Sequence, residues 1–393
     1  MCHGIDLALV VYTRVYSNKG NSMSAELIRA MARGEALQLG AYNAGLSDEA
    51  VRRRFNVPRI ARLASNENPL GAGLLAQKAL SDSASLCAVY PDAASQTLRQ
   101  AIAHRLAMTP DRIIMGNGSE DILKLLCLAF IKPGDRVVTL LPSFGLHVLY
   151  PQMMGADVTL VPVDARMRYD LPAWEQALRS PVKMMIFSNP SNPVGCMLDN
   201  GEFRRLIDAA PADCLLVVDE AYYEYCADLA DYPDSLAILR RQPRPWIVLR
   251  TFSKAYGLAG LRVGYGLAGD PAITDLLNRV RTPFNINRGA QAAALAALGD
   301  QAHVRKSVAH VRAQRRALQS ALAAMGLVTA PSQANFLFCR VPEDAAAIAE
   351  KLLAYGVIIK PWLENGYRDW LRVSIGDEAD QRQFLTALAG VLA

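Results

Sequence analysis

Short apolar runs alternate with segments of helical periodicity through the middle of the chain. Apolar residues recur at helical spacing over 119–130, 171–178 and 201–209, for example. Because continuously apolar strands alternate with helices, we expect a parallel sheet that is covered by helices on both faces. The strand-like runs lie at 136–141, 157–163, 182–188, 214–220, 245–251 and 261–268.

The pattern changes toward the C-terminus, where two long helical periods cover 285–298 and 301–325. Strands and helices are mixed after them, which predicts a second, smaller α+β domain. The shorter segments lie at 334–340, 344–355, 356–362 and 370–376, and a closing helix follows.

We expect the chain to divide into three parts, since 393 residues are enough for more than one domain. An N-terminal arm covers residues 1–36, and a helix begins in it at Met23. The large domain covers 76–294, and the small domain combines 37–75 with 295–393.

Composition and charge exclude several classes of protein. The net charge of +5 comes without a Lys/Arg-rich block, so we expect no nucleic-acid partner. The seven cysteines are scattered and form no C-x-x-C pair, which favours a reducing cytoplasm and predicts no zinc site. The five histidines lack metal-ligand spacing and are interpreted as surface or core residues. The apolar run over 7–12 is too short to span a membrane.

Polar motifs follow three of the predicted strands. The stretch "NPSNPVG" (189–195) comes after one strand, Asp219 ends the next, and Ser253 and Lys254 follow a third. Ligands of open α/β sheets bind outside the carboxyl ends of the strands. We therefore expect these residues to meet at one edge of the sheet.

Lys254 has the surroundings of a reactive amine rather than those of a surface lysine. Burial and nearby cations lower the pKa of a lysine and make it nucleophilic, and Arg262 follows closely in the sequence. The hydroxyls of Thr251 and Ser253 and the guanidinium of Arg262 suit phosphate oxygens. A glycine-rich turn, "GNGSED", opens a helix at Ser119, where free backbone N–H groups attract anions.

The remaining polar residues suggest what the lysine reacts with. A carboxylate at a buried strand end needs a cation or donor, and Asp219 could pair with a protonated ring nitrogen. Tyr222 and Asn192 could donate to a phenolate-like oxygen, and Phe144 offers a flat apolar face. A lysine imine with an aspartate at the ring nitrogen is the arrangement that binds pyridoxal 5′-phosphate.

The motifs also resemble a known family. "SNPSNPVG", "DEAYYEY" and "TFSKAYGLAGLRVGYG" resemble those of the fold-type I, class II aminotransferases. "ASNENPLG", "YPD", "GNGSED" and "RTPFNINRGAQAAALAAL" are similar to those of histidinol-phosphate aminotransferases. The resemblance runs from about Leu37 to the C-terminus. It implies the fold-type I fold, with a large, mostly parallel sheet covered by helices and a smaller α+β domain.

The resemblance implies a role for each residue toward the cofactor. Lys254 would form the imine and move the proton, and Asp219 would keep the pyridine nitrogen protonated. Tyr222 and Asn192 would bind the ring oxygen, with Phe144 stacked on the ring. The phosphate would be held by Ser119, Glu120 (through its backbone N–H), Thr251, Ser253 and Arg262, and by Tyr90 of a neighbouring subunit, so a homodimer is expected.

The residues that face the substrate follow the family less closely. Arg372 resembles the arginine that clamps the substrate carboxylate, and Tyr42 matches a tyrosine near the distal phosphate. Lys360 stands where many members carry arginine, and Arg288 replaces a residue that is often small. The resemblance implies ping-pong amino transfer between L-histidinol phosphate and 2-oxoglutarate in histidine biosynthesis.

Other functions stay open at this point. An aromatic or broad-range aminotransferase and a phosphothreonine-type decarboxylase could use the same lysine and aspartate. A nicotinamide-dependent oxidoreductase is disfavoured because G-x-G-x-x-G is missing. A DNA-binding regulator built on this fold is disfavoured because the N-terminal region is too short for a helix-turn-helix module.

Overall fold

The computed structural model describes residues 22–40 and 46–393. The chain divides into two compact units, Met1–Ala41 and Tyr42–Ala393. In the first unit, α1 (Ser22–Met31) and α2 (Gly34–Gln38) are two short helices, where the sequence predicts one. The backbone of Arg33 is extended between them, and the glycine that follows weakens helix continuation.

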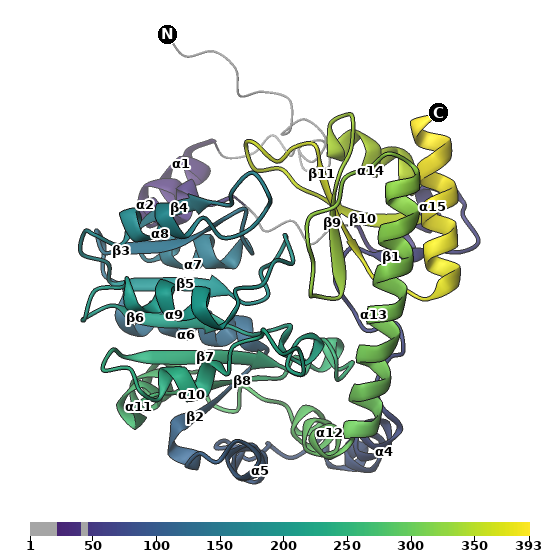
Figure 1. The fold of residues 1–393 in the computed structure, drawn as a ribbon. Helices are drawn as coiled ribbons and strands as arrows, with labels where there is room; N and C mark the ends of the chain where they lie inside the picture. Colours follow the sequence, from purple (N-terminus) through teal and green to yellow (C-terminus); the bar gives the residue numbers. More distant parts are fainter. Residues whose placement is uncertain (1–21, 41–45) are drawn as a thin grey trace. The chain divides into compact units, whose positions relative to one another are not determined.

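A seven-stranded sheet forms the larger part of the second unit (Figure 1). The strand order is β2-β8-β7-β6-β5-β3-β4, and β8 runs antiparallel to both of its neighbours while the other pairings are parallel. The predicted, mostly parallel sheet is therefore confirmed. Its strands are β2 (Ile113–Gly116), β3 (Arg136–Leu141), β4 (Asp157–Pro162), β5 (Met184–Ser188), β6 (Leu215–Asp219), β7 (Trp246–Thr251) and β8 (Gly264–Ala268).

Two details of this sheet differ from the sequence prediction. Strand β2 was not predicted, because four residues directly before a glycine-rich turn give too short a pattern. Strand β8 begins at Gly264 rather than at residue 261, because Arg262 has a left-handed backbone with φ of 57°. A short 3₁₀ helix, Ala259–Leu261, occupies the start of the predicted strand instead.

Helices cover both faces of the sheet, as the apolar strands require. Successive residues of a strand point to opposite faces, so Val137 and Val138 belong to different core clusters, as do Leu215 and Leu216. One face carries α6 (Ser119–Phe130), α7 (Leu146–Met153) and α11 (Pro271–Val280), and the other carries α8 (Leu171–Ala177), α9 (Asn200–Asp208) and α10 (Ser235–Leu239) (Figure 1).

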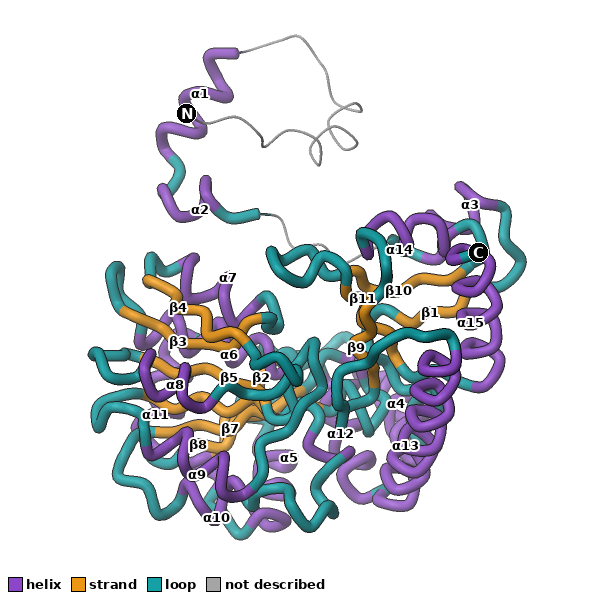
Figure 2. Tube along the Cα trace, turned by 45° about the horizontal axis from the view of Figure 1, so that its top comes forward, coloured by secondary structure: helices purple, strands orange, loops and turns teal. Residues whose placement is uncertain are grey.

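A second sheet of four strands has the order β1-β10-β11-β9. It consists of β1 (Ala61–Leu63), β9 (Phe336–Arg340), β10 (Val357–Pro361) and β11 (Trp370–Ser374). The long helix α13 (Gln301–Ala324) runs beside this sheet together with α14 (Ala345–Leu353) and α15 (Glu378–Leu392) (Figure 2). The strands come from both ends of the unit, and the domain boundaries given above stay a prediction.

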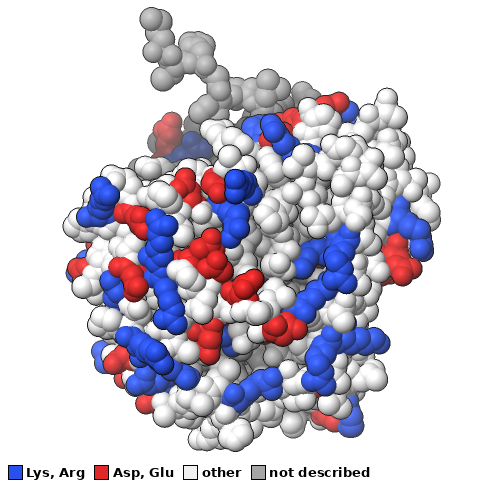
Figure 3. Space-filling model, in the orientation of Figure 1, with Lys and Arg blue, Asp and Glu red and all other residues white. Residues whose placement is uncertain are grey.

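The remaining helices connect these two sheets or flank them. They are α3 (Asp48–Phe55), α4 (Leu74–Ser83), α5 (Gln96–Leu106) and α12 (Arg288–Gly299). Acidic and basic side chains are intermixed on the face shown in Figure 3. Within residues 22–40 and 46–393, no helix is long and apolar enough to cross a membrane. The same residues bring together no cluster of His, Cys, Asp or Glu that could hold a metal ion.

A buried ion pair joins β6 to β7 where both strands end. The Glu220 carboxylate accepts from Nε and Nη2 of Arg250, each at 2.8 Å, and both side chains are almost fully buried. The hydroxyls of Tyr232 and Ser235 donate to its other oxygen. The Arg250 guanidinium also stacks on the Tyr223 ring, 3.5 Å from its centroid. These contacts satisfy both charges inside the protein.

Replacing Arg250 with leucine should therefore destabilise the fold strongly. Removal of one partner leaves a buried charge uncompensated, which costs about 3–5 kcal/mol. Chemical denaturation of the purified variant measures this change. The matched control is Arg340→Leu, which breaks an exposed pair with Asp369 and should cost less than about 1 kcal/mol. Equal effects of the two substitutions would contradict the prediction.

Candidate active site

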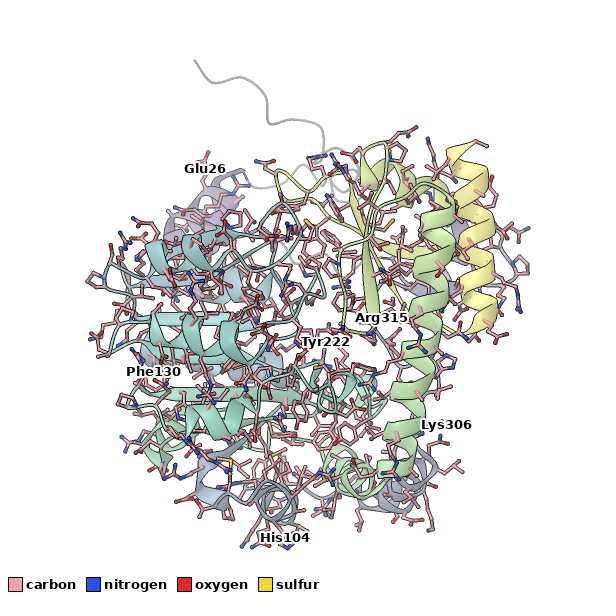
Figure 4. The ribbon with its side chains drawn as sticks, viewed as in Figure 1. Glu26, His104, Phe130, Tyr222, Lys306 and Arg315 are labelled. Carbon is pink, nitrogen blue, oxygen red and sulfur yellow. The ribbon has the colours of Figure 1, made fainter. Side chains whose placement is uncertain are left out.

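The carboxyl ends of β5, β6 and β7 lie side by side and carry the polar residues predicted from the sequence. Asp219 is the last residue of β6 and pairs in register with Ser188 on β5 and Leu249 on β7. Asn192 follows β5, and Lys254 follows β7. Figure 4 shows Tyr222, which follows β6, between the large sheet and the second sheet. These segments therefore lie at one edge of the sheet, as predicted.

Lys254 lies in the loop after β7, with its amine directed at a neighbouring backbone carbonyl. Its Nζ donates to the carbonyl oxygen of Ser65 at 3.0 Å and lies 5.9 Å from the centroid of the Tyr222 ring. Burial, and after it the positive charges of Arg372 and Arg262, lower the pKa of Lys254 to about 8. Near neutral pH, the neutral and nucleophilic form of this amine is therefore far more populated than it is for an ordinary lysine.

A cradle for an anion forms where α6 begins, opposite the end of β7. Gly118 precedes the helix with φ of +83°, and a Cβ there would lie 2.6 Å from Nη2 of Arg262. A Cβ on Gly264 would lie 2.5 Å from the backbone nitrogen of Ser119. Only glycine permits these close approaches. As a result, the first backbone N–H groups of α6 lie close to the Arg262 guanidinium, and both attract anions.

Two hydroxyls lie in this cradle, and a carboxylate orients its arginine. Thr251 pairs in register with Gly264, and its hydroxyl lies 2.9 Å from that of Ser253. Nη2 of Arg262 donates to the Glu120 carboxylate at 2.7 Å, and its Nη1 donates to the carbonyl of Ala259 at 3.0 Å. The Glu120 side chain thus orients the arginine, in addition to the predicted role of its backbone N–H.

The Asp219 carboxylate is buried and held by two donors. The backbone N–H of Ala221 donates to Oδ1 at 3.0 Å, and Nε2 of His147 lies 3.0 Å from Oδ2. The other ring nitrogen of His147 lies 3.3 Å from the hydroxyl of Ser143. These contacts fix the direction in which the carboxylate faces.

His147 is a core residue, in agreement with the interpretation from the sequence. The sequence did not predict that this buried ring also orients the aspartate. The available signal was its place two residues after "LPSFG" (141–145), a stretch that begins with the last residue of β3. The Phe144 ring, predicted as the flat apolar face, packs perpendicular to His147 with 5.5 Å between centroids. Phe144 and Asp219 are therefore joined through one side chain.

The second sheet contributes two cations to the same region. Arg372 on β11 and Lys360 on β10 are register partners. Nη1 of Arg372 donates to Oδ1 of Asn192 at 2.7 Å, so the second sheet contacts the end of β5. The pKa of Lys360 is lowered first by burial and then by Arg372. A carboxylate or phosphate would be attracted by this pair of charges.

Sequence reasoning missed the segment 64–66, although it quoted the surrounding motif. The carbonyl of Ala64 accepts from Arg372, that of Ser65 accepts from Lys254, and the side chain of Asn66 donates to Tyr222 at 2.9 Å. Three consecutive residues thus contact three of the predicted site residues. The spacing of the sequence alone gives no sign of these contacts.

Tyr90, predicted at the cofactor phosphate, and Arg288, noted as a departure from the family, do not join this cluster. Tyr90 is 75% exposed and its ring stacks on Phe284 at 4.7 Å. Arg288 donates to the carbonyls of Val89 and Tyr90, so it supports the segment that carries the tyrosine. These side chains line an open groove of about 870 Å³ beside α4 and α12. Tyr42 lies outside the described residues.

The fold and the arrangement of Lys254, Asp219 and the cradle define a class of group-transfer enzymes. The family model for aminotransferase class I and II matches residues 58–388, so the chain belongs to that family. Within it, the chain belongs to the histidinol-phosphate aminotransferases, whose curated members include proteins 36–48% identical over most of its length. Both predictions of the family are confirmed.

Three comparisons illustrate this similarity. Histidinol-phosphate aminotransferase 1 of Mesorhizobium japonicum is 48% identical over 92% of this chain and 98% of its own length. Histidinol-phosphate aminotransferase 3 of Rhizobium meliloti is 42% identical over 92% and 97%. The crystal structure of histidinol-phosphate aminotransferase from Sinorhizobium meliloti in complex with pyridoxal-5′-phosphate matches with a TM-score of 0.84, 28% identity, and coverage of 92% and 98%.

The lowered pKa of Lys254 predicts an unusual pH dependence in the cofactor-free protein. Modification of this lysine by an amine-reactive reagent should accelerate as pH rises and reach half its maximum near the pKa of about 8, because only the neutral amine reacts. Peptide mapping by mass spectrometry follows the site-specific rate. Arg372→Leu should move the midpoint upward, since it removes a cation. A midpoint in the usual range of a lysine side chain would contradict the expectation.

Proposed function

We propose that the protein is a pyridoxal 5′-phosphate-dependent aminotransferase that exchanges an amino group between L-histidinol phosphate and 2-oxoglutarate. The observation that carries the proposal is the position of the Lys254 amine, whose pKa is lowered, and of the buried Asp219 carboxylate at the carboxyl ends of the neighbouring strands β7 and β6. The names of the relatives and the ligand of the Sinorhizobium meliloti structure support the same activity. This activity would serve histidine biosynthesis.

The residues present fit that cofactor. The glycine-lined cradle at Ser119 and Arg262 has the N–H groups and charge that a phosphate monoester requires. Asp219 is a buried carboxylate that can face a protonated ring nitrogen, while Tyr222 and Asn192 carry groups that can reach a ring oxygen. When bound, the cofactor supplies an electron sink for the substrate carbon.

The side chains of this chain would then divide the work. Lys254 would hold the cofactor covalently and would take up and return a proton at Nζ. A pKa of about 8 suits both steps, because a group that exchanges protons works best when its pKa lies near the working pH. Asp219 holds its charge in one place through His147 and Ala221. Phe144 limits the space beside the ring.

Arg372 and Lys360 would receive the anionic end of each substrate. Histidinol phosphate carries a phosphate, and 2-oxoglutarate carries carboxylates, so one pair of cations can serve both halves of a ping-pong cycle. Lysine at position 360 keeps the positive charge but cannot form the bidentate contact of an arginine. We infer that recognition at this position depends on charge more than on geometry.

We further propose that the working form is a homodimer in the cytoplasm. Exposed apolar side chains line the groove at Tyr90, among them Leu80 and Phe284, and an apolar surface of this kind favours association. Tyr90 would reach the phosphate of the neighbouring subunit. The described cysteines are all free and most are buried, which suits a reducing compartment.

Lys254→Ala should keep the fold and abolish catalysis. Turnover is expected to fall by several orders of magnitude (~10³-fold or more), because the covalent step and the proton transfer are both lost. Borohydride treatment of the wild type with cofactor should bleach its yellow colour and attach the cofactor to Lys254, which peptide mass spectrometry detects. A variant with nearly normal activity would refute the assignment of Lys254.

The choice of amino donor is tested by comparing single half-reactions. Histidinol phosphate should discharge the visible band faster than phenylalanine, tyrosine or glutamate. Lys360→Met should weaken the reaction with histidinol phosphate by about 10-fold or more, the worth of one charge-assisted hydrogen bond. The matched control is Lys351→Met, at an exposed lysine paired with Glu343, which should change nothing. Equal or faster reaction with phenylalanine or tyrosine would indicate an aromatic aminotransferase instead.

A further inference from the structure

Asn66 occupies a strained and buried position beside the predicted cofactor residues. Its backbone has φ of 55°, in the left-handed region that asparagine tolerates better than most residues. The residue is 1% exposed. Its carbonyl accepts from Nδ2 of Asn335 at 2.9 Å, and its side-chain Nδ2 donates to the hydroxyl oxygen of Tyr222 at 2.9 Å. So many contacts at one residue indicate that its orientation is fixed.

Ser374 on β11 determines which end of the Asn66 amide faces Tyr222. The backbone N–H of Asn66 donates to the Ser374 hydroxyl at 2.8 Å, and this hydroxyl donates to Oδ1 of Asn66 at 2.9 Å. The serine hydroxyl thus receives one proton and gives its own to the amide oxygen. The NH₂ end of the amide is therefore the end that faces Tyr222.

We propose that Asn66 is a positioning residue that makes Tyr222 a hydrogen-bond donor toward the cofactor. A phenol has one proton and can also accept. Because Asn66 donates to the Tyr222 oxygen, the tyrosine proton must point away from Asn66. This inference rests on the proposed function, in which that proton is given to the ring oxygen of pyridoxal 5′-phosphate.

The consequence concerns the ionisation of the bound cofactor. A donated hydrogen bond favours the charged form of an oxygen and lowers the pH at which that form appears. Charged groups near Tyr222 also act on it: Lys254 lies near its ring, and Arg372 lies near Phe336, which packs edge-on against Tyr222 at 5.1 Å. Asp219 lies three residues away in the chain. These groups are unchanged in the variants below.

Asn66→Asp tests the inference while keeping the size and backbone preference of the residue. An aspartate would accept from Tyr222 and take its proton away from the cofactor. We expect the pH midpoint of the visible band in the reconstituted enzyme to rise by about one pH unit, as for the loss of one hydrogen bond to a charged oxygen. Tyr222→Phe should raise the midpoint by a similar amount. When Asn66→Asp is combined with Tyr222→Phe, the midpoint should rise little beyond that of Tyr222→Phe alone.

Ser374→Ala makes the same test without a change of charge. It frees the amide of Asn66 to turn its oxygen toward Tyr222, so the midpoint should again rise, and it should not rise further in the Tyr222→Phe background. Ser374→Thr keeps the hydroxyl and should keep the wild-type midpoint. Thermal unfolding of each variant shows whether the fold is intact.

The outcomes separate this inference from the proposed function. If the wild type mixed with pyridoxal 5′-phosphate develops no visible band, the proposed function fails. If the band appears but Ser374→Ala leaves its midpoint unchanged, the role of Asn66 is overturned while the proposed function stands. A shift in Ser374→Ala that adds fully to that of Tyr222→Phe would also overturn it, because this charge-neutral change would then act independently of the tyrosine.

Discussion

The buried Glu220–Arg250 pair is the constraint on which the rest of the site depends. Each partner is the chain neighbour of a predicted site residue, Asp219 on β6 and Thr251 on β7. Successive side chains of a strand alternate in direction, so an ion pair on one side of the two strands sets the spacing of the groups on the other. Tyr232 connects the ion pair to the end of β5. Its hydroxyl contacts Glu220 and also lies 2.8 Å from the carbonyl of Asn189, the residue after that strand.

Much of the fold could be predicted from the sequence because short local runs of residues indicate the strands. Runs such as 136–141 and 246–251 are apolar on both faces, and such runs are stable only inside a covered sheet. The antiparallel direction of β8 could not be predicted in this way. It depends on the left-handed backbone at Arg262 and on pairing with β2, which lies far away in the sequence.

The site residues at strand ends could be predicted for a similar reason, because the carboxyl ends of parallel strands lie at one edge of the sheet. His147 and Asn66 were not, because their importance comes from contacts with residues 72 and 156 positions away. Neither residue type has a spacing that indicates such a partner. The roles assigned to individual side chains toward the cofactor remain predictions of chemistry and await the measurements described.

The origin of the site in two different sheets has an evolutionary consequence. The amine and the carboxylate belong to the seven-stranded sheet, whereas Arg372 and Lys360 belong to the four-stranded one. After gene duplication, mutations on β10 or β11 can alter which molecules are accepted while the reacting groups stay in place. Descendants of one ancestor can in this way acquire new metabolic niches and retain a shared reaction.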